Sequence, residues 1–238
     1  MVKDKIYLKD ALINSPVLTV SVYGSGGTGS HLVDKLAAIA YAFEKTTDRR
    51  IKLAVYDFDM VDPRNVARSD FTTGDIGFTK TQITVSKANI GYGLEWEVRN
   101  PFLTTVGQAN FHFLCTDDAK SRLEYIGRIL GTNQYGEPED KSYYIFDVGN
   151  DKDFGQIVLL DKEGLLADID RKTITSETVG TVTCADGLFD AQGLFVNQFM
   201  ALCTAQMFWT FITDFNLEYS QLWVNLGMMK IISKLEWK

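Results

Sequence analysis

Four glycines follow an apolar run in the stretch VYGSGGTGSHL, residues 22–32. Gly24, Gly26 and Gly29 have the spacing G-x-G-x-x-G, which is typical of a turn between a strand and a helix that presents backbone N–H groups to a phosphate. Three glycines at this spacing also occur in plain tight turns. The motif therefore indicates two alternatives, a nucleotide site and a purely structural turn.

Charged residues that suit a nucleotide follow the next apolar run. Asp57 comes directly after residues 51–56, at the position where a nucleotide-binding fold reaches the ribose hydroxyls. This much also fits an NAD(P)-dependent oxidoreductase. Asn65, Arg68 and Lys80 lie within the same connection, and a triphosphate requires such polar and cationic groups more than a pyrophosphate does. The connection therefore favours ATP.

A further acidic residue, Asp117, occurs in the stretch CTDDAKSR after a later apolar run. A carboxylate at the same edge of a sheet suits a Mg²⁺ ion that bridges phosphate oxygens. Each residue also has a simpler interpretation. Arg68 and Lys80 could be solvated surface charges, and Asp117 or Asp118 could cap the following helix.

Hydrophobic periodicity predicts the elements that must position these side chains. Apolar and β-branched runs predict strands at residues 17–23, 51–56, 94–98, 111–115 and 143–146. Apolar residues at helical spacing predict helices over residues 31–43, 80–90 and 119–130. Strands that alternate with helices form right-handed parallel crossovers. We therefore expect an α/β fold with a doubly wound, mostly parallel, Rossmann-like sheet.

The C-terminal third has a different pattern. The stretches GQIVLL and QLWVNL predict strands of an antiparallel extension, and an apolar helix is expected over residues 190–215. Neither a repeat nor a clear linker occurs, so we expect one domain over residues 1–238. Its parts would be a nucleotide-binding part at residues 1–160, a mobile crossover loop at residues 161–189, and the C-terminal helix and strands at residues 190–238.

Composition limits the class of protein. The 238 residues are 45% hydrophobic, enough for a buried core, and carry a formal net charge of -7 without a dense basic run. Nucleic acid is therefore not an expected partner. No apolar segment approaches the roughly 18 residues of a membrane-spanning helix, so we expect a cytoplasmic protein without a membrane partner. The three cysteines form no C-x-x-C pair for zinc and no disulfide framework.

The blocks GSGGTGS, DFDMVDPRNVAR, GDIGFTK and CTDDAKSR occur in an order and spacing that resemble the ubiquitin-activating superfamily, which includes ThiF and MoeB. The resemblance covers about residues 17–160. The stretch CADGLFDAQGLFVNQFMALCTAQMFW is similar to the ThiF-related members of PRTRC (ParB-related, ThiF-related cassette) gene sets. The resemblance implies a ThiF-like adenylyltransferase that uses ATP and Mg²⁺ to adenylate the C-terminal glycine of a small ubiquitin-like protein, and that forms a homodimer.

The resemblance also implies roles for individual residues. It assigns the following residues to the nucleotide site: Gly24, Gly26, Gly27, Gly29, Asp57, Asp59, Asn65, Arg68, Lys80 and Asp117. Asp57 would bind the ribose, and Asp117 would bind the magnesium ion. Asn65, Arg68 and Lys80 would contact the phosphates. The bare glycine turn would leave room for the nucleotide and an incoming Gly-Gly tail, which a side chain at Gly26 or Gly27 would fill.

Arg68, Lys80 and Asp117 are thereby the implied catalytic residues, together with Cys184. Cys184 precedes the last large helix, near the place where some relatives keep the cysteine that accepts the activated tail. A thiolate at a helix N-terminus would be activated for a thioester or sulfur-transfer step. The alternative is a small buried thiol. The other two cysteines lie in apolar surroundings and are expected in the core.

Two departures from the family pattern favour a further alternative, a non-catalytic ThiF-like scaffold. Ser69 stands where the family often has glutamine, and no arginine precedes Arg49 to reach the partner subunit's ATP. Lys3, Lys5 or Lys9 would have to replace that arginine, and lysine lacks its planar fork.

The apolar residues near the C-terminal helix exceed what one helix face buries, which also favours a homodimer. A core helix that packs on two sides is the alternative. The residues concerned are Phe195, Phe199, Met207, Phe208, Trp209 and Phe211.

Overall fold

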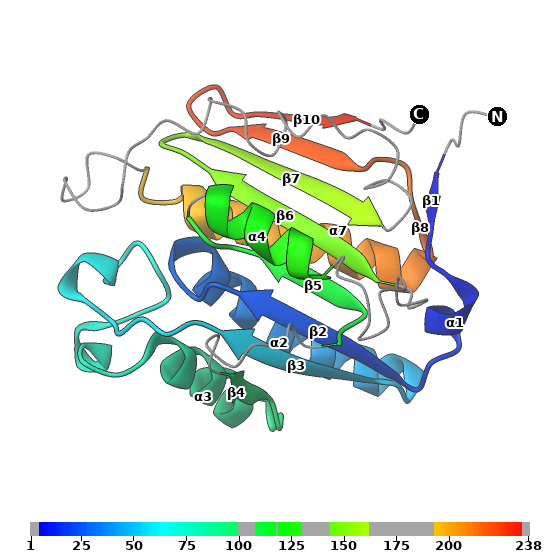
Figure 1. Ribbon diagram of the computed structural model, residues 1–238, viewed down its shortest axis with the longest axis horizontal. Helices are drawn as coiled ribbons and strands as arrows, with labels where there is room; N and C mark the ends of the chain where they lie inside the picture. The colour runs from blue at the N-terminus through cyan, green and yellow to red at the C-terminus, as the bar shows by residue number, and fades with distance from the viewer. Residues whose placement is uncertain (1–4, 100–107, 118, 130–142, 162–192, 235–238) are drawn as a thin grey trace.

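The computed structural model describes residues 5–99, 108–117, 119–129, 143–161 and 193–234 (Figure 1). Its strands are β1 (Ile6–Tyr7), β2 (Val17–Tyr23), β3 (Arg50–Tyr56), β4 (Glu97–Arg99), β5 (Phe111–Leu114), β6 (Tyr144–Asn150), β7 (Phe154–Asp161), β8 (Asn216–Leu217), β9 (Gln221–Asn225) and β10 (Lys230–Lys234). Its helices are α1 (Asp10–Ile13), α2 (Gly27–Thr47), α3 (Lys80–Tyr92), α4 (Ala119–Ile129) and α7 (Val196–Asp214), with 3₁₀ turns η1 (Pro63–Asn65) and η2 (Thr73–Asp75).

Eight of these strands form one sheet with the order β10-β9-β7-β6-β5-β2-β3-β4. The strands from β6 to β4 pair in parallel, whereas β7, β9 and β10 are antiparallel to their neighbours. Figure 1 shows α4 in front of the sheet and α2 and α7 behind it, and α3 packs against α2. The structure therefore confirms the predicted α/β fold, doubly wound and mostly parallel, with a C-terminal antiparallel extension.

Helix α7 is apolar on nearly all sides because it packs against both the sheet and α2. Met207, Phe208 and Phe211 are fully buried, and the Phe208 ring lies edge-on against Phe111 of β5. These three residues are core residues of a two-sided helix, so they do not support a homodimer. Phe195, at the N-terminal end of the helix, is 65% exposed. No helix in the described ranges has both the length and the apolar character needed to cross a bilayer.

Several boundaries differ from the prediction. β4 begins at Glu97, three residues later than expected, and α7 begins at Val196 rather than at residue 190. β6 continues to Asn150 because it pairs with β7 along its whole length. Asp161, expected in the crossover loop, belongs to β7. The rest of that loop, residues 162–189, lies outside the described residues. The division of the chain into functional parts stays a prediction.

His112 of β5 is a buried histidine that the fold holds neutral. Its Nε2 lies 3.0 Å from the carbonyl oxygen of Ala109, and since a carbonyl can only accept, Nε2 carries the proton. Nδ1 then accepts a hydrogen bond from the Tyr23 hydroxyl at 3.3 Å. Burial lowers the pKa of His112 to about 4.

We expect His112 to make the folded state sensitive to acid. The unfolded chain binds a proton near pH 6.5, the ordinary pKa of histidine, whereas the folded chain does so only near pH 4. Neutral His112 therefore contributes about 3 kcal/mol to the free energy of unfolding. This contribution is complete above pH 6.5 and is lost as the pH falls toward 4. Urea unfolding between pH 7 and pH 4 should show a shallower pH dependence in His112→Gln than in the wild type.

His31→Gln is the matched control, because His31 is the only other histidine and is partly buried. Its removal should change the pH dependence less than removal of His112. Parallel curves for the wild type and His112→Gln would contradict the prediction.

Candidate nucleotide-binding site

The strand order creates a switch point between β2 and β5. The chain passes from β2 through α2 to β3 on one side, and from β5 through α4 to β6 on the other. Ligands of doubly wound sheets bind outside the carboxyl ends of the strands at such a point. The glycine turn follows β2 and Asp117 follows β5, so the structure brings both predicted motifs to this edge of the sheet.

The glycines of the turn differ in how much space surrounds them. Gly24 has a φ of +89°, and a Cβ there would lie 2.9 Å from the carbonyl oxygen of Cys115. A Cβ at Gly29 would lie 1.9 Å from the carbonyl oxygen of Gly24. Close backbone packing thus excludes side chains at both positions. A Cβ at Gly26 would meet nothing within 4 Å, so this side of the turn is open.

The surroundings of Gly27 differ from the prediction that a side chain there would fill the room left for the ligands. A Cβ at Gly27 would lie 2.6 Å from the side-chain amide of Asn197 in α7. The space beside Gly27 is therefore filled by the protein itself, and the open space lies at Gly26.

Asp57, Asp59 and Lys80 form a connected polar group beside the turn. Oδ2 of Asp57 accepts hydrogen bonds from the backbone N–H of Ser25 at 2.7 Å and from its hydroxyl at 3.2 Å, which ties the end of β3 to the turn. Oδ1 of Asp57 accepts from the backbone N–H of Asp59 at 2.8 Å. The Lys80 ammonium lies 2.7 Å from Oδ2 of Asp59, and the Lys80 side chain is only 10% exposed. Lys80 is therefore not a solvated surface charge.

Asn65 and Arg68 lie in the connection between β3 and α3. Oδ1 of Asn65 accepts a hydrogen bond from the backbone N–H of Asp62 at 2.9 Å, so part of this side chain stabilises η1. Ala67 has a φ of +70°, a left-handed conformation that is unfavourable for a residue with a Cβ. This residue turns the chain immediately before Arg68, whose side chain is partly buried.

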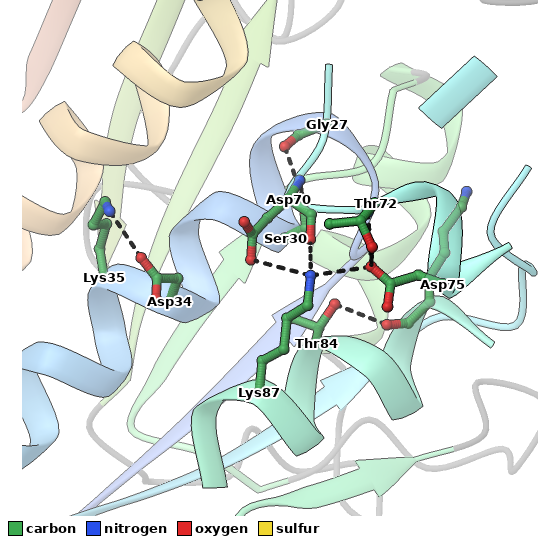
Figure 2. Close-up of polar contacts among 10 residues, drawn as sticks. Gly27, Ser30, Asp34, Lys35, Asp70, Thr72, Asp75, Thr84 and Lys87 are labelled. Atoms are coloured by element: carbon green, nitrogen blue, oxygen red, sulfur yellow. Dashed lines mark hydrogen bonds and ion pairs between the residues drawn. The ribbon is translucent and has the colours of Figure 1, made fainter. Parts of the chain in front are cut away.

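The segment after Arg68 is tied to two helices (Figure 2). The backbone N–H of Asp70 donates to the Ser30 hydroxyl at 2.9 Å, and that hydroxyl donates to the Gly27 carbonyl at 3.2 Å. The Lys87 ammonium of α3 donates to the Asp70 carbonyl and lies 3.2 Å from Oδ2 of Asp75. These contacts hold the loop that carries Arg68 against the first turn of α2 and against α3.

Several buried polar atoms around the turn lack a hydrogen-bond partner. Within the described ranges, atoms of this kind include Nε of Arg68 and the hydroxyl oxygens of Ser69 and Thr116. Arg68 and Ser69 lie on the loop tied to α2, and Thr116 lies beside the position that a Gly24 side chain would take. A buried polar atom without a partner costs about 1–3 kcal/mol. Such atoms need an explanation, and a polar ligand is one.

Sequence reasoning missed a buried ion pair that lies next to Thr116. Arg122 of α4 and Asp147 of β6 have side chains that are 1% and 0% exposed, and Nε of Arg122 lies 2.9 Å from Oδ1 of Asp147. Burial raises the pKa of Asp147, and the neighbouring guanidinium opposes this shift. Nη1 of Arg122 donates to the Thr116 carbonyl at 3.0 Å, so the pair supports the chain immediately before Asp117. The only signal in the sequence was an acidic residue inside the apolar run YYIFDVGN.

The cysteines within the described ranges are not prepared as nucleophiles. Burial raises the pKa of the Cys115 thiol to about 12 and that of the Cys203 thiol to about 11. Cys184 and Asp118 lie outside the described residues. Asp117 is exposed, and in the part of the chain that the structure describes no three or more metal-ligating side chains gather around one point.

Comparisons with known proteins identify the fold. No family model matches the chain, and no curated protein matches its sequence. The structure is similar to that of E. coli MccB with succinimide, with a TM-score of 0.63 and 18% identity over 95% of this chain and 65% of MccB. It is also similar to microcin C7 biosynthetic enzyme MccB in complex with N-formylated MccA (TM-score 0.64, 16% identity, 95% of this chain and 66% of that one). The structure is similar to the same degree to that of PaaA, with a TM-score of 0.63 and 16% identity over 95% of this chain and 74% of PaaA. The chain thus shares the fold of MccB and PaaA, and spans 65% of the length of MccB.

Proposed function

We propose that the chain is an ATP-dependent adenylyltransferase that activates the C-terminal carboxylate of a small protein or peptide. The observation that carries this proposal is the arrangement at the switch point. The glycine turn is open at Gly26, the Lys80 ammonium is almost buried beside the turn, and the buried Nε of Arg68 has no hydrogen-bond partner. The anionic oxygens of a triphosphate are suitable acceptors for both cations, and a dinucleotide offers fewer of them.

Solved structures of MccB support the proposal because of the ligands that they contain. E. coli MccB has been solved with ATP, and with AMPCPP together with MccA. A nucleotide and MccA therefore bind MccB at the same time. Since this chain shares the fold, a nucleotide and a polypeptide are the two ligand classes to test on it first.

The proposed reaction needs no general base. The carboxylate of the acceptor is ionised at neutral pH, so one of its oxygens attacks the α-phosphorus of ATP directly. A bond forms between that oxygen and the phosphorus, the bond to the bridging oxygen breaks, and pyrophosphate leaves with the electron pair. Arg68 and Lys80 would orient the phosphates and neutralise their charge. Asp117 would hold a Mg²⁺ ion, which supplies further charge neutralisation.

We further propose the specific identity that the sequence resemblance implies. The chain would be a ThiF-related member of a PRTRC gene set within the ubiquitin-activating superfamily. Its acceptor would be a small ubiquitin-like protein that ends in glycine. The resemblance also supports a homodimer of one adenylation domain, and the composition supports action in the cytoplasm without nucleic acid or a membrane as partner.

ATP–pyrophosphate exchange tests the proposed activity. With saturating Mg·ATP and a panel of small proteins that end in glycine and are encoded beside the gene, we expect exchange with the cognate acceptor. Thermal unfolding with Mg·ATP, NAD and NADP distinguishes an oxidoreductase, because only Mg·ATP should raise the midpoint. Binding of Mg·ATP without exchange for any acceptor would favour the scaffold, and stabilisation by NAD or NADP alone would overturn the assignment to ATP.

A transfer step at Cys184 can be separated from adenylation. In this step the Cys184 thiolate attacks the acyl carbon, AMP leaves and a thioester forms. Cys184→Ser should therefore retain exchange but form no reducible adduct, because the two half-reactions use different groups. A non-reducing gel after incubation with Mg·ATP and the acceptor detects the adduct, and Cys203→Ser is the matched control. A thiol-sensitive band that persists in Cys184→Ser would assign the transfer to another group.

A further inference from the structure

Asn197 is a buried side chain that joins three parts of the candidate site. It lies in the first turn of α7 and is 2% exposed. Its Oδ1 accepts hydrogen bonds from the Thr28 hydroxyl at 3.1 Å and from the Asn150 amide. Its Nδ2 donates to the carbonyl oxygen of Arg68 at 3.3 Å. One amide thereby connects α7 to the first turn of α2, to the end of β6 and to the loop that carries Arg68.

The surroundings fix the orientation of this amide. Nδ2 of Asn150 also donates to the Thr28 hydroxyl at 3.1 Å, so Asn150, Thr28 and Asn197 form a closed ring of hydrogen bonds. The backbone of the glycine turn packs against the amide, because a Cβ at Gly27 would lie 2.6 Å from it. These hydrogen bonds direct Oδ1 of Asn197 toward Thr28 and Asn150, and they leave Nδ2 directed at the Arg68 carbonyl.

We propose that Asn197 is a positioning residue, which sets the position of Arg68 relative to the glycine turn and so lets α7 influence the affinity for the phosphates of the nucleotide. Asn197 of α7 binds the Arg68 carbonyl. Two residues later, Ser30 of α2 accepts a hydrogen bond from the backbone N–H of Asp70. The Arg68 side chain therefore extends from a backbone segment that two helices hold in place. The expected effect on ATP rests on the proposed function, whereas the effect on the loop does not.

Asparagine meets both demands of the position. The ring needs an acceptor and the Arg68 carbonyl needs a donor, and an amide supplies the two on one rigid group. Aspartate has the same shape and keeps the acceptors for Thr28 and Asn150. It loses the donor, however, and directs a carboxylate oxygen at the Arg68 carbonyl. Asn197→Asp therefore separates the link to Arg68 from the packing of the helix.

Hydrogen exchange and ATP binding test this inference together. In Asn197→Asp, amide exchange in peptides that cover residues 66–70 should be faster than in the wild type. The Kd for Mg·ATP should rise about tenfold, as expected for one lost hydrogen bond. When Asn197→Asp is added to Arg68→Ala, binding of Mg·ATP should weaken no further, because Asn197 acts on the nucleotide only through Arg68. If Asn197→Asp does not fold, Asn197→Ser replaces it, because serine is too short to reach the carbonyl.

Thr204→Ala is the matched control. Thr204 is buried in the same helix, and its hydroxyl donates to the Met200 carbonyl within α7. This variant should change neither the exchange of residues 66–70 nor the Kd. Wild-type behaviour of Asn197→Asp in both measurements, equal effects of Thr204→Ala, or additive losses in the double variant would overturn the inference. Faster exchange in Asn197→Asp, with no binding of Mg·ATP by the wild type, would instead overturn the proposed function and support the positioning of the loop.

Discussion

Replacing Arg68 by alanine is expected to slow ATP–pyrophosphate exchange about a hundredfold, the effect of removing one preorganised donor from a developing charge. The fold should persist, because the buried Nε of Arg68 makes no hydrogen bond that the variant would lose. The contacts that hold this loop run instead through the Arg68 carbonyl and the Asp70 N–H, which alanine leaves in place. Thermal unfolding without nucleotide checks the fold, and the exchange rate at saturating Mg·ATP and acceptor checks the role.

Lys80→Ala should cause a loss of the same order for the same reason. Its effect on stability should be small, since its partner Asp59 is 52% exposed and water can hydrate the carboxylate. Arg64→Ala is the matched control for both variants, because Arg64 lies in the same connection, is exposed and pairs with Asp62 nearby. Near-normal exchange in both Arg68→Ala and Lys80→Ala would contradict the assignment. A comparable loss in Arg64→Ala would show that disturbance of the connection, and not loss of a phosphate contact, causes the effect.

The parts of the fold that could be predicted are those with a local signature. Central strands such as β2 and β5 are buried, so their sequences are short apolar runs. Once strands and helices alternate, the parallel rule brings the glycine turn and Asp117 to one edge of the sheet without any knowledge of contacts. The exposed strand β10 and the short strand β4 have no such signature. All five residues of β10 and all three of β4 are exposed, so neither strand has a buried face to require a continuous apolar run.

The candidate site shows the same division. The glycines and Lys80 could be selected by spacing and charge along the chain. Asn197 could not, because its hydrogen bond to the Arg68 carbonyl joins residues 129 positions apart. The role of Gly27 was misjudged for this reason, since its neighbour comes from the distant helix α7. Arg122 was part of a recognised motif, but its partner Asp147 becomes visible only when β6 is placed next to β5.

Replacing Arg122 by methionine is expected to reduce the free energy of unfolding by about 3–5 kcal/mol at neutral pH, because Asp147 is then left buried without its counterion. A matched pair of changes separates this charge effect from packing. In Arg122→Met/Asp147→Leu no buried charge remains at this pair, so most of the lost stability should return. Urea unfolding measures all three proteins, and a double variant less stable than Arg122→Met would contradict the explanation.

The pH dependence of the stability lost in Arg122→Met tests the same explanation independently. Burial already raises the pKa of Asp147, and loss of the guanidinium removes the group that opposes this shift. The folded variant therefore binds a proton at Asp147 at a higher pH than the unfolded chain, so its stability falls as the pH rises above the ordinary range of aspartate. We expect the difference from wild type to be smaller near pH 5 than near pH 8. A deficit that is the same at both values would show that Arg122 stabilises the fold through packing and its hydrogen bond to Thr116, and not through the charge of Asp147.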